Sequence, residues 1–213
     1  NVALACAKYK KWLIHASTVC VYGNIQGHHE VEDFTFPEKE DETLPNPSEL
    51  YACSKYAAEW IVKGYGKNFG MPWTILRFAT IYGEGMREAM GLHIFITQAL
   101  KGNPLTVHGD GKQDRTLTYL NDLVDGITAV LEHPEAQGEV INLTAPKAIS
   151  ALQMANDVIS LSGNLGSVVH IAQRPNQTFH EDFDVSKAKK LLNWEAKTPW
   201  KKGLAETIKW LKK

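Results

Sequence analysis

The sequence alternates between short apolar runs and longer segments of helical periodicity, and this alternation constrains the fold more than any other feature. The apolar runs, which we predict as strands, cover residues 12–16, 73–77, 105–108 and 140–143. The predicted helices cover 48–69, 92–101, 120–132, 150–162, 185–192 and 200–212. Alternation of this kind is typical of an α/β protein whose mainly parallel sheet is covered by helices.

Charge and cysteine content narrow the classes of partner that the chain can have. Its 213 residues include 23 Lys and Arg and 24 Asp and Glu, which gives a formal net charge of -1. This balance does not favour a nucleic-acid surface, and no apolar run reaches the roughly 18 residues of a membrane span. None of the three cysteines belongs to a C-x-x-C pair. We therefore expect no metal site and a reducing compartment, with the cytoplasm as the default location.

Two polar clusters stand out from this pattern. Tyr51 and Lys55 lie four residues apart in a predicted helix, so they share one face, and the Lys55 cation favours the phenolate form of Tyr51. Tyr51 is therefore a candidate acid/base near neutral pH. Ser17 and Thr18 follow the strand predicted at 12–16. Because hydroxyl groups at the carboxyl end of such a strand lie where open α/β sheets bind ligands, both clusters should meet at one crevice.

These residues and their flanks resemble the extended short-chain dehydrogenase/reductase family, specifically its NAD-dependent nucleotide-sugar epimerase/dehydratase branch. Members of that branch carry a hydroxyl-rich strand end that runs into V-Y-G, followed by Y-x-x-x-K, as at 17–23 and 51–55 here. Three later blocks follow. Residues 77–83 are similar to R-x-x-N-V-Y-G, and residues 107–122 are similar to V-x-G-D-G followed by R-D-F-x-Y-V-x-D. Residues 174–194 are similar to R-P-G-D followed by D-x-S-K-A and L-G-W. The five blocks keep the order of the family and cover nearly the whole chain.

The resemblance implies a Rossmann-like, doubly wound, mainly parallel sheet with a smaller α+β substrate domain. Residues 1–82 and 117–146 would belong to the NAD-binding domain, and 83–116 and 147–213 to the nucleotide-sugar substrate domain. Family members begin with a strand, a glycine-rich turn and a helix that hold the dinucleotide pyrophosphate. This sequence has no such turn, so we expect the N-terminal strands of the fold to be missing and the polypeptide alone to bind NAD poorly.

The same resemblance assigns the chemistry to three residues. Tyr51 would take the proton from a sugar hydroxyl while a hydride leaves the same carbon for the nicotinamide. Lys55 would favour the phenolate and bind the nicotinamide ribose, and Thr18 would share the proton of the sugar hydroxyl. Ser17, nearer the nicotinamide, and Ala79 complete the expected cofactor contacts. The implied cofactor is NAD, and NADP stays open.

Nucleotide-sugar contacts are implied at five further positions. Arg115 and Arg174 correspond to two arginines that bind the diphosphate, and two guanidinium groups match its geometry and charge. Thr80 replaces the Asn that is usual in the third block. His108 falls where a side chain often stacks on the nucleobase, and Leu92 falls near the uracil pocket.

The neighbours of Thr18 distinguish the reactions of this branch. Dehydratases place an Asp-Glu pair directly after the Thr, because elimination needs its own acid and base. Val19 and Cys20 stand there in this sequence, which disfavours a dehydratase. Members that epimerise at carbons 3 and 5 carry a Cys at the position of Cys20 and a Lys further on, but the stretch 83–91 holds no Lys. We therefore interpret Cys20 as a buried apolar side chain.

The sequence as a whole predicts an NAD-dependent isomerase that epimerises a nucleotide-diphosphate sugar at carbon 4 through a transient keto-sugar, as UDP-glucose 4-epimerases do. Three alternatives stay open: a nucleotide-sugar reductase or dehydrogenase, a dehydratase, and a non-catalytic nucleotide-binding fragment. Family members usually form homodimers through the helix that carries Y-x-x-x-K. The side chains of Tyr56, Ala57, Trp60 and Ile61 are compatible with that contact and equally with core packing.

Overall fold

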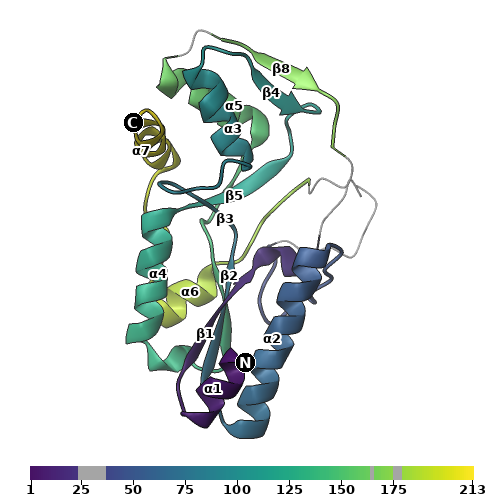
Figure 1. Ribbon diagram of the computed structural model, residues 1–213, viewed down its shortest axis with the longest axis vertical. Helices are drawn as coiled ribbons and strands as arrows, with labels where there is room; N and C mark the ends of the chain where they lie inside the picture. Colours follow the sequence, from purple (N-terminus) through teal and green to yellow (C-terminus); the bar gives the residue numbers. More distant parts are fainter. Residues whose placement is uncertain (24–36, 164–165, 175–178) are drawn as a thin grey trace.

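A parallel three-stranded sheet lies at the centre of the lower half of the molecule as drawn in Figure 1. Its strands are β1 (Leu13–Thr18), β2 (Trp73–Phe78) and β6 (Glu139–Leu143), in the order β1-β2-β6. The structure is a computed structural model that describes residues 1–23, 37–163, 166–174 and 179–213. The β1 strand ends in the one-turn 3-10 helix η1 (Val19–Tyr22).

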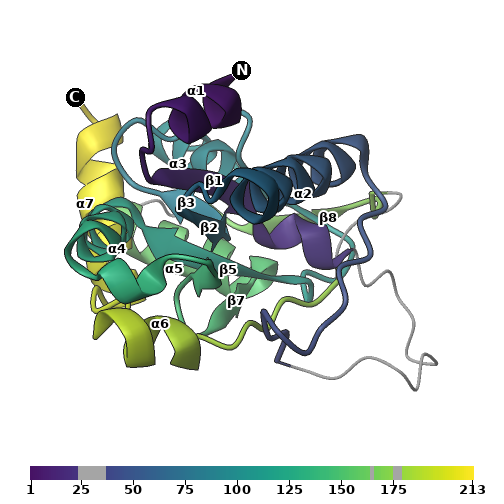
Figure 2. The same ribbon diagram turned by 90° about the horizontal axis from the view of Figure 1, so that it is seen from below.

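Helices cover both faces of this sheet (Figure 2). Those on one face are α1 (Val2–Lys8) and α2 (Leu50–Phe69), and those on the other are α4 (Leu120–Glu132) and α6 (Ser186–Leu192). Successive side chains of a strand point to opposite faces, so β2 serves two cores. Its Ile75 packs with Val62 of α2, whereas Leu76 packs with Leu123 of α4. The result is the doubly wound, mainly parallel α/β sheet that the sequence predicted.

The upper half of the molecule is built from two smaller sheets and three helices (Figure 1). One sheet has the order β3-β5-β7, with β3 parallel and β7 antiparallel to β5, and the other pairs β4 with β8 in parallel. The bounds are β3 Thr80–Tyr82, β4 Leu105–His108, β5 Asp114–Tyr119, β7 Ala148–Ser150, β8 Val168–Ile171, α3 Gly91–Leu100, α5 Ala151–Ser162 and α7 Trp200–Leu211. A single buried apolar cluster that includes Ile96, Val107, Val158 and Leu204 holds these elements together.

The predicted helices and strands all form, and none of their ends shifts by more than two residues. Ser150 caps α5, because its Oγ accepts a hydrogen bond of 3.1 Å from the Gln153 backbone N–H. The strands β3, β5, β7 and β8 were not predicted, and neither were the 3-10 helices η1 and η2 (Pro134–Ala136). The division into two domains at the bounds given above stays a prediction. Among the described residues, none of the helices combines the length and apolarity that a bilayer crossing requires.

Gly203 of α7 allows this helix to approach two aromatic rings closely, and we expect Gly203→Ala to destabilise the fold. A Cβ atom at Gly203 would lie 2.3 Å from Tyr82 Oη and 3.0 Å from Tyr119 Cδ2. Because Tyr82 is buried and cannot retreat, the free energy of unfolding should fall by about 1–3 kcal/mol in urea titrations. Gly64→Ala in α2, whose Cβ would meet nothing within 4 Å, is the control and should raise it by about 0.5–1 kcal/mol. Equal stability of Gly203→Ala and the parent would contradict this packing.

Candidate active site

A cleft of about 830 Å³ opens where β1 and β2 end. Its walls come from the carboxyl end of β1, the first turns of α2, the segment from β2 to α3, and parts of β4 and β5. The structure brings to this one cleft all ten residues singled out from the sequence, namely Ser17, Thr18, Tyr51, Lys55, Ala79, Thr80, Leu92, His108, Arg115 and Arg174. The roles assigned to them stay predictions.

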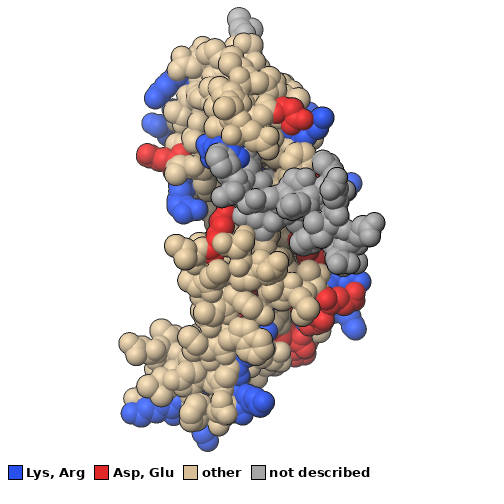
Figure 3. Space-filling view, turned by 90° about the vertical axis from the view of Figure 1, so that its right-hand side faces the viewer, with Lys and Arg blue, Asp and Glu red and all other residues tan. Residues whose placement is uncertain are grey.

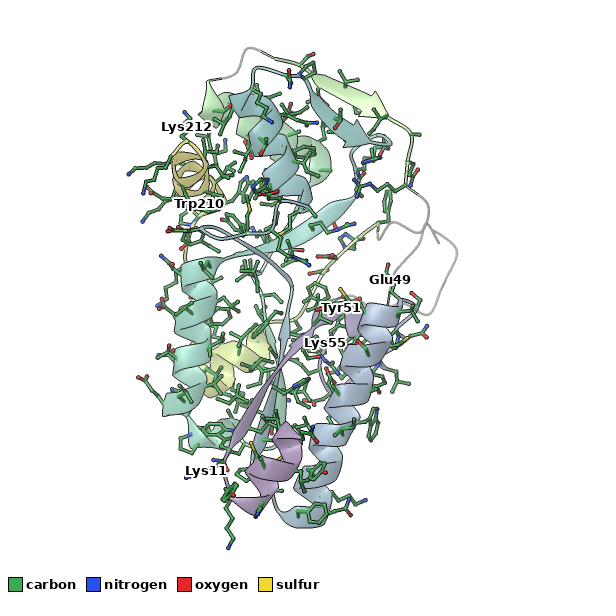
Figure 4. All side chains as sticks on the ribbon, in the orientation of Figure 1. Lys11, Glu49, Tyr51, Lys55, Trp210 and Lys212 are labelled. Carbon is green, nitrogen blue, oxygen red and sulfur yellow. The ribbon has the colours of Figure 1, made fainter. Side chains whose placement is uncertain are left out.

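Tyr51 and Lys55 occupy the first two turns of α2, on the side of the helix that faces the end of β1 (Figure 4). The Lys55 ammonium donates a hydrogen bond of 3.0 Å to the Ala16 carbonyl oxygen and lies 6.0 Å from the centroid of the Tyr51 ring. That distance is at the outer limit of a cation–π contact. Tyr51 itself is 54% exposed, so its phenol is accessible to a ligand in the cleft.

Thr18 is held at the end of β1 by the turn that follows it. Its Oγ1 accepts a hydrogen bond of 3.2 Å from the Cys20 backbone N–H, which makes Thr18 the N-cap of η1. This contact uses an oxygen lone pair and leaves the O–H hydrogen for a second partner. The hydroxyl is therefore oriented and can still donate.

Ser17, the neighbour of Thr18, directs its hydroxyl towards α2. Its Oγ donates a hydrogen bond of 2.6 Å to Glu59 Oε1, and both residues are buried. The hydroxyl hydrogen of Ser17 is thus used within the protein, while the residue also lines the cleft. Its contact with a cofactor stays a prediction.

At the far end of the cleft, His108 positions Arg174. The Arg174 Nε–H donates to His108 Nε2 at 2.9 Å, and His108 Nδ1 lies 2.8 Å from the carbonyl oxygen of Ala172. A carbonyl oxygen can only accept, so His108 carries its hydrogen on Nδ1 and is neutral in this arrangement. The rest of the R-P-G-D-like segment, 175–177, lies outside the described residues.

Glu181 lines the same cleft and was not singled out from the sequence. Its Oε2 accepts a hydrogen bond of 2.8 Å from the Thr116 backbone N–H, and its Oε1 lies 3.6 Å from Arg115 Nε. Burial raises the pKa of the Glu181 carboxyl, and the Arg115 cation opposes that shift. No local pattern distinguishes Glu181 from its acidic neighbour Asp182, so only the packing of the chain identifies it. Arg87 also lines the cleft.

The interpretation of Cys20 as a buried side chain is wrong. Cys20 is exposed and lines the cleft, because η1 turns the chain directly after Thr18 and presents Cys20 there, whereas Val19 is buried. Loss of surrounding water within the cleft raises the pKa of its thiol.

Within the ranges that the structure covers, no cluster of three or more His, Cys, Asp or Glu residues could hold a metal ion.

Comparison with known proteins identifies the family. The family model described as "NAD dependent epimerase/dehydratase family" matches residues 1–144. This chain therefore belongs to the NAD-dependent epimerase/dehydratase family, as the motifs indicated.

Several known proteins are similar to this chain. The chain is 36% identical to the uncharacterized UDP-glucose epimerase YtcB of Bacillus subtilis over 211 residues, which are 97% of this chain and 63% of that protein. It superposes with a TM-score of 0.87 and 31% identity on the UDP-glucuronic acid 4-epimerase from Bacillus cereus, solved with UDP-glucuronic acid and NAD, covering 99% of this chain and 65% of that one. It also superposes on the UDP-glucose 4-epimerase of Thermotoga maritima, solved with UDP-glucose, with a TM-score of 0.89 and 26% identity. This match covers 99% of this chain and 67% of that one. The chain thus spans about two thirds of the length of these relatives.

Glu38 is a buried carboxyl near Glu181 whose ionisation opposes folding. It is 3% exposed, and its Oε2 has no hydrogen-bond partner among the described residues. Burial raises the pKa of Glu38 from 4.5 to about 8, and the carboxylates of Glu181 and Asp182 add to this shift. Between these two pH values, the unfolded chain ionises at this residue whereas the folded chain keeps the proton.

We therefore compare the free energy of unfolding of the parent with that of Glu38→Gln. As the pH rises from about 4.5 to about 8, the value for the parent should fall further than the value for Glu38→Gln. The loss should be complete above this window, because Glu38 is then ionised in both states. Urea unfolding of the two proteins across the pH range measures the difference. Parallel stability curves for the parent and Glu38→Gln would contradict the raised pKa.

Proposed function

We propose that the protein is an NAD-dependent isomerase that epimerises a nucleotide-diphosphate sugar at carbon 4 through a transient keto-sugar. The observation that carries this proposal is that Tyr51, Lys55 and Thr18 line the same cleft as Arg115 and Arg174. A proton-handling group and two cations suited to a diphosphate therefore face one ligand space. The 4-epimerase relatives support the same assignment.

The residues at the end of β1 and the start of α2 fit the nicotinamide end of NAD. An ammonium group has three N–H donors, and the Ala16 carbonyl takes one from Lys55, so hydroxyl groups of a ribose could accept others. Ser17 and Ala79 border the same part of the cleft. When bound, NAD supplies the acceptor for the hydride that leaves the sugar carbon.

Tyr51 and Thr18 then handle the proton. The Tyr51 phenolate takes the proton of the sugar hydroxyl, and the positive charge of Lys55 stabilises that phenolate. Thr18 hydrogen-bonds the same hydroxyl and keeps it directed at the phenol. After the keto-sugar turns over in the cleft, hydride would return to the opposite face of carbon 4, and Tyr51 returns the proton to the same oxygen. One acid/base residue is enough, since the proton and the hydride both return to the sugar.

The nucleotide part of the substrate is assigned to the other end of the cleft. Arg115 and Arg174 bind the diphosphate, and Thr80 contributes a hydroxyl. Leu92 and His108 contact the nucleobase. We also propose that residues 83–116 and 147–213 form the substrate domain and that 1–82 and 117–146 form the NAD domain. The buried cluster of the upper half supports this division for most elements, whereas α6 packs with α4 and β6 of the lower half.

The alternatives are distinguished by their cofactor balance and their chemistry. Relatives of this chain include a UDP-N-acetyl-alpha-D-glucosaminuronate decarboxylase and a dTDP-D-glucose 4,6-dehydratase, so family membership alone does not set the reaction. A dehydratase needs a carboxylic acid after Thr18, where Val19 and Cys20 stand. A reductase or dehydrogenase changes the absorbance of reduced nicotinamide at every turnover, whereas an epimerase leaves it constant. A non-catalytic nucleotide-binding protein would bind the sugar without converting it.

Tyr51→Phe tests the proposal in the protein expressed from its complete gene. Removal of the acid/base hydroxyl should lower kcat by about 10²–10⁴-fold, with the dissociation constant of the nucleotide sugar unchanged within about twofold. Tyr65→Phe, on the same helix and packed on Phe69, is the matched control and should keep full turnover. Sugar interconversion followed by chromatography gives the rates. Full activity of Tyr51→Phe would refute the role of this phenol.

We further propose that the protein forms a homodimer through α1 and α2 and that it resides in the cytoplasm. The two helices lie side by side on one face of the sheet (Figure 2). Trp60 and Ile61 are 59% and 57% exposed, and Val2 and Leu4 of α1 are also exposed. Figure 3 shows the side that carries α2, where uncharged residues predominate and Lys and Arg gather at the lower end.

The three free cysteines are compatible with a reducing compartment, which supports the proposed location in the cytoplasm.

Ile61→Lys should separate the proposed dimer into monomers, because it places a charge in an apolar contact. Sedimentation velocity is expected to show a halved mass. Leu131→Lys, at a position that is 62% exposed on α4, serves as the control and should leave the mass unchanged. A monomeric parent, or a dimeric Ile61→Lys protein, would contradict the assignment.

A further inference from the structure

A buried ion pair connects α2 to the sheet one helical turn beyond Lys55. Glu59 is 0% exposed and Arg77 of β2 is 1% exposed. Arg77 Nη2 lies 2.8 Å from Glu59 Oε2, and Arg77 Nε donates to Glu59 Oε1 at 3.0 Å, so the contact is bidentate. Ser17 Oγ donates to the same Oε1 at 2.6 Å. The Glu59 carboxylate therefore binds side chains from two strands at once.

Strand pairing explains how both side chains reach Glu59. Ser17 and Arg77 are register partners on the parallel strands β1 and β2, so they point to the same face of the sheet. That face is the one covered by α2, as the packing of Ile75 with Val62 shows.

The other side of the Arg77 guanidinium is also fixed. Its Cζ lies 4.7 Å from the centroid of the Tyr22 ring, within the range of a cation–π contact. Tyr22 Oη donates a hydrogen bond of 2.9 Å to Asn142 Oδ1 on β6. Burial raises the pKa of Tyr22 to about 12, so this phenol remains a donor at neutral pH. The network thus spans all three strands of the sheet and the V-Y-G motif.

The position of Glu59 on α2 relates this network to the cleft. Residues four apart share a helix face, and Tyr51, Lys55 and Glu59 follow that spacing. The neighbouring buried residues of α2, Ala52 and Val62, make apolar contacts that have no preferred direction. A bidentate carboxylate–guanidinium pair has a fixed geometry, so it can set the rotation and height of the helix.

We infer that Glu59 and Arg77 are positioning residues, and that their ion pair places Tyr51 and Lys55 opposite Thr18. Ser17 transmits the same constraint to the strand end that carries Thr18. The inference rests on the proposed function, because it assigns a purpose to the position of Tyr51. A buried ion pair is weak evidence for stability, since apolar residues of similar volume often replace one without loss. The pair should therefore matter more for geometry than for folding.

The test uses the double variant Glu59→Met/Arg77→Met in the protein expressed from its complete gene. Loss of Glu59 alone would leave the Arg77 charge buried without a partner, so the double variant is the one that folds. We expect its melting temperature to stay close to that of the parent and its kcat to fall by about 100-fold, because small misplacements of reacting groups have effects of this size. The KM for the nucleotide sugar should change by less than about twofold, since Arg115 and Arg174 are untouched.

Two further variants separate positioning from a general structural effect. Arg77→Lys keeps the charge but loses the bidentate contact, and it should recover part of the lost kcat. Lys189→Met/Glu195→Gln removes an exposed ion pair of 2.9 Å and should behave as the parent. A double Met variant with parental kcat, or one whose KM rises in proportion to the loss of kcat, would overturn the inference.

Crystal structures of the parent and the double Met variant test the positioning role without an activity measurement. The hydrogen bond of 3.0 Å from Lys55 Nζ to the Ala16 carbonyl should persist in the parent and be lost in the variant. An unchanged Lys55 position in the variant would refute the positioning role. An inactive parent would instead refute the proposed function, so the two failures are distinguishable.

Discussion

The parallel pairing of β1 with β2 is the constraint on which the rest of the structure depends. Thr18 pairs with Phe78 at the last position of both strands, so Ala79 and Thr80 follow at the same edge of the sheet. The connection between two parallel strands must return along the sheet, and α2 makes this return. Its first turns therefore lie at the carboxyl ends of the strands. Tyr51 and Lys55 reach the cleft because they occupy those turns.

Contacts within the protein also organise the cleft. Glu181 contacts Arg115, and His108 accepts a hydrogen bond from Arg174, so both guanidinium groups assigned to the diphosphate already have partners that restrict them. Prior restriction of this kind lowers the entropy lost on binding. The Lys55 ammonium is held in the same manner by the Ala16 carbonyl.

Much of this arrangement follows from the sequence. Where the sequence does not predict a feature, there is a physical reason for the failure. Long helices carry strong periodicity, a strand such as β2 stands out as a short apolar run, and Tyr51 with Lys55 is a local pattern on one helix. Strands such as β3 and β7 have only three residues each, too few to show a period. The Glu59–Arg77 pair joins residues 18 positions apart, and Glu181 meets Thr116 across 65 positions. Such contacts exist only once the chain has folded, and the exposure of Cys20 likewise depends on the turn made by η1.

The most direct test of the central claim is a crystal structure of the protein, expressed from its complete gene, with NAD and a UDP-sugar bound. We expect Tyr51 Oη and Thr18 Oγ1 to lie within about 2.6–3.2 Å of one and the same sugar hydroxyl, on the carbon that faces the nicotinamide. A complex in which the two oxygens contact different groups, or in which the sugar lies away from Tyr51, would contradict the account.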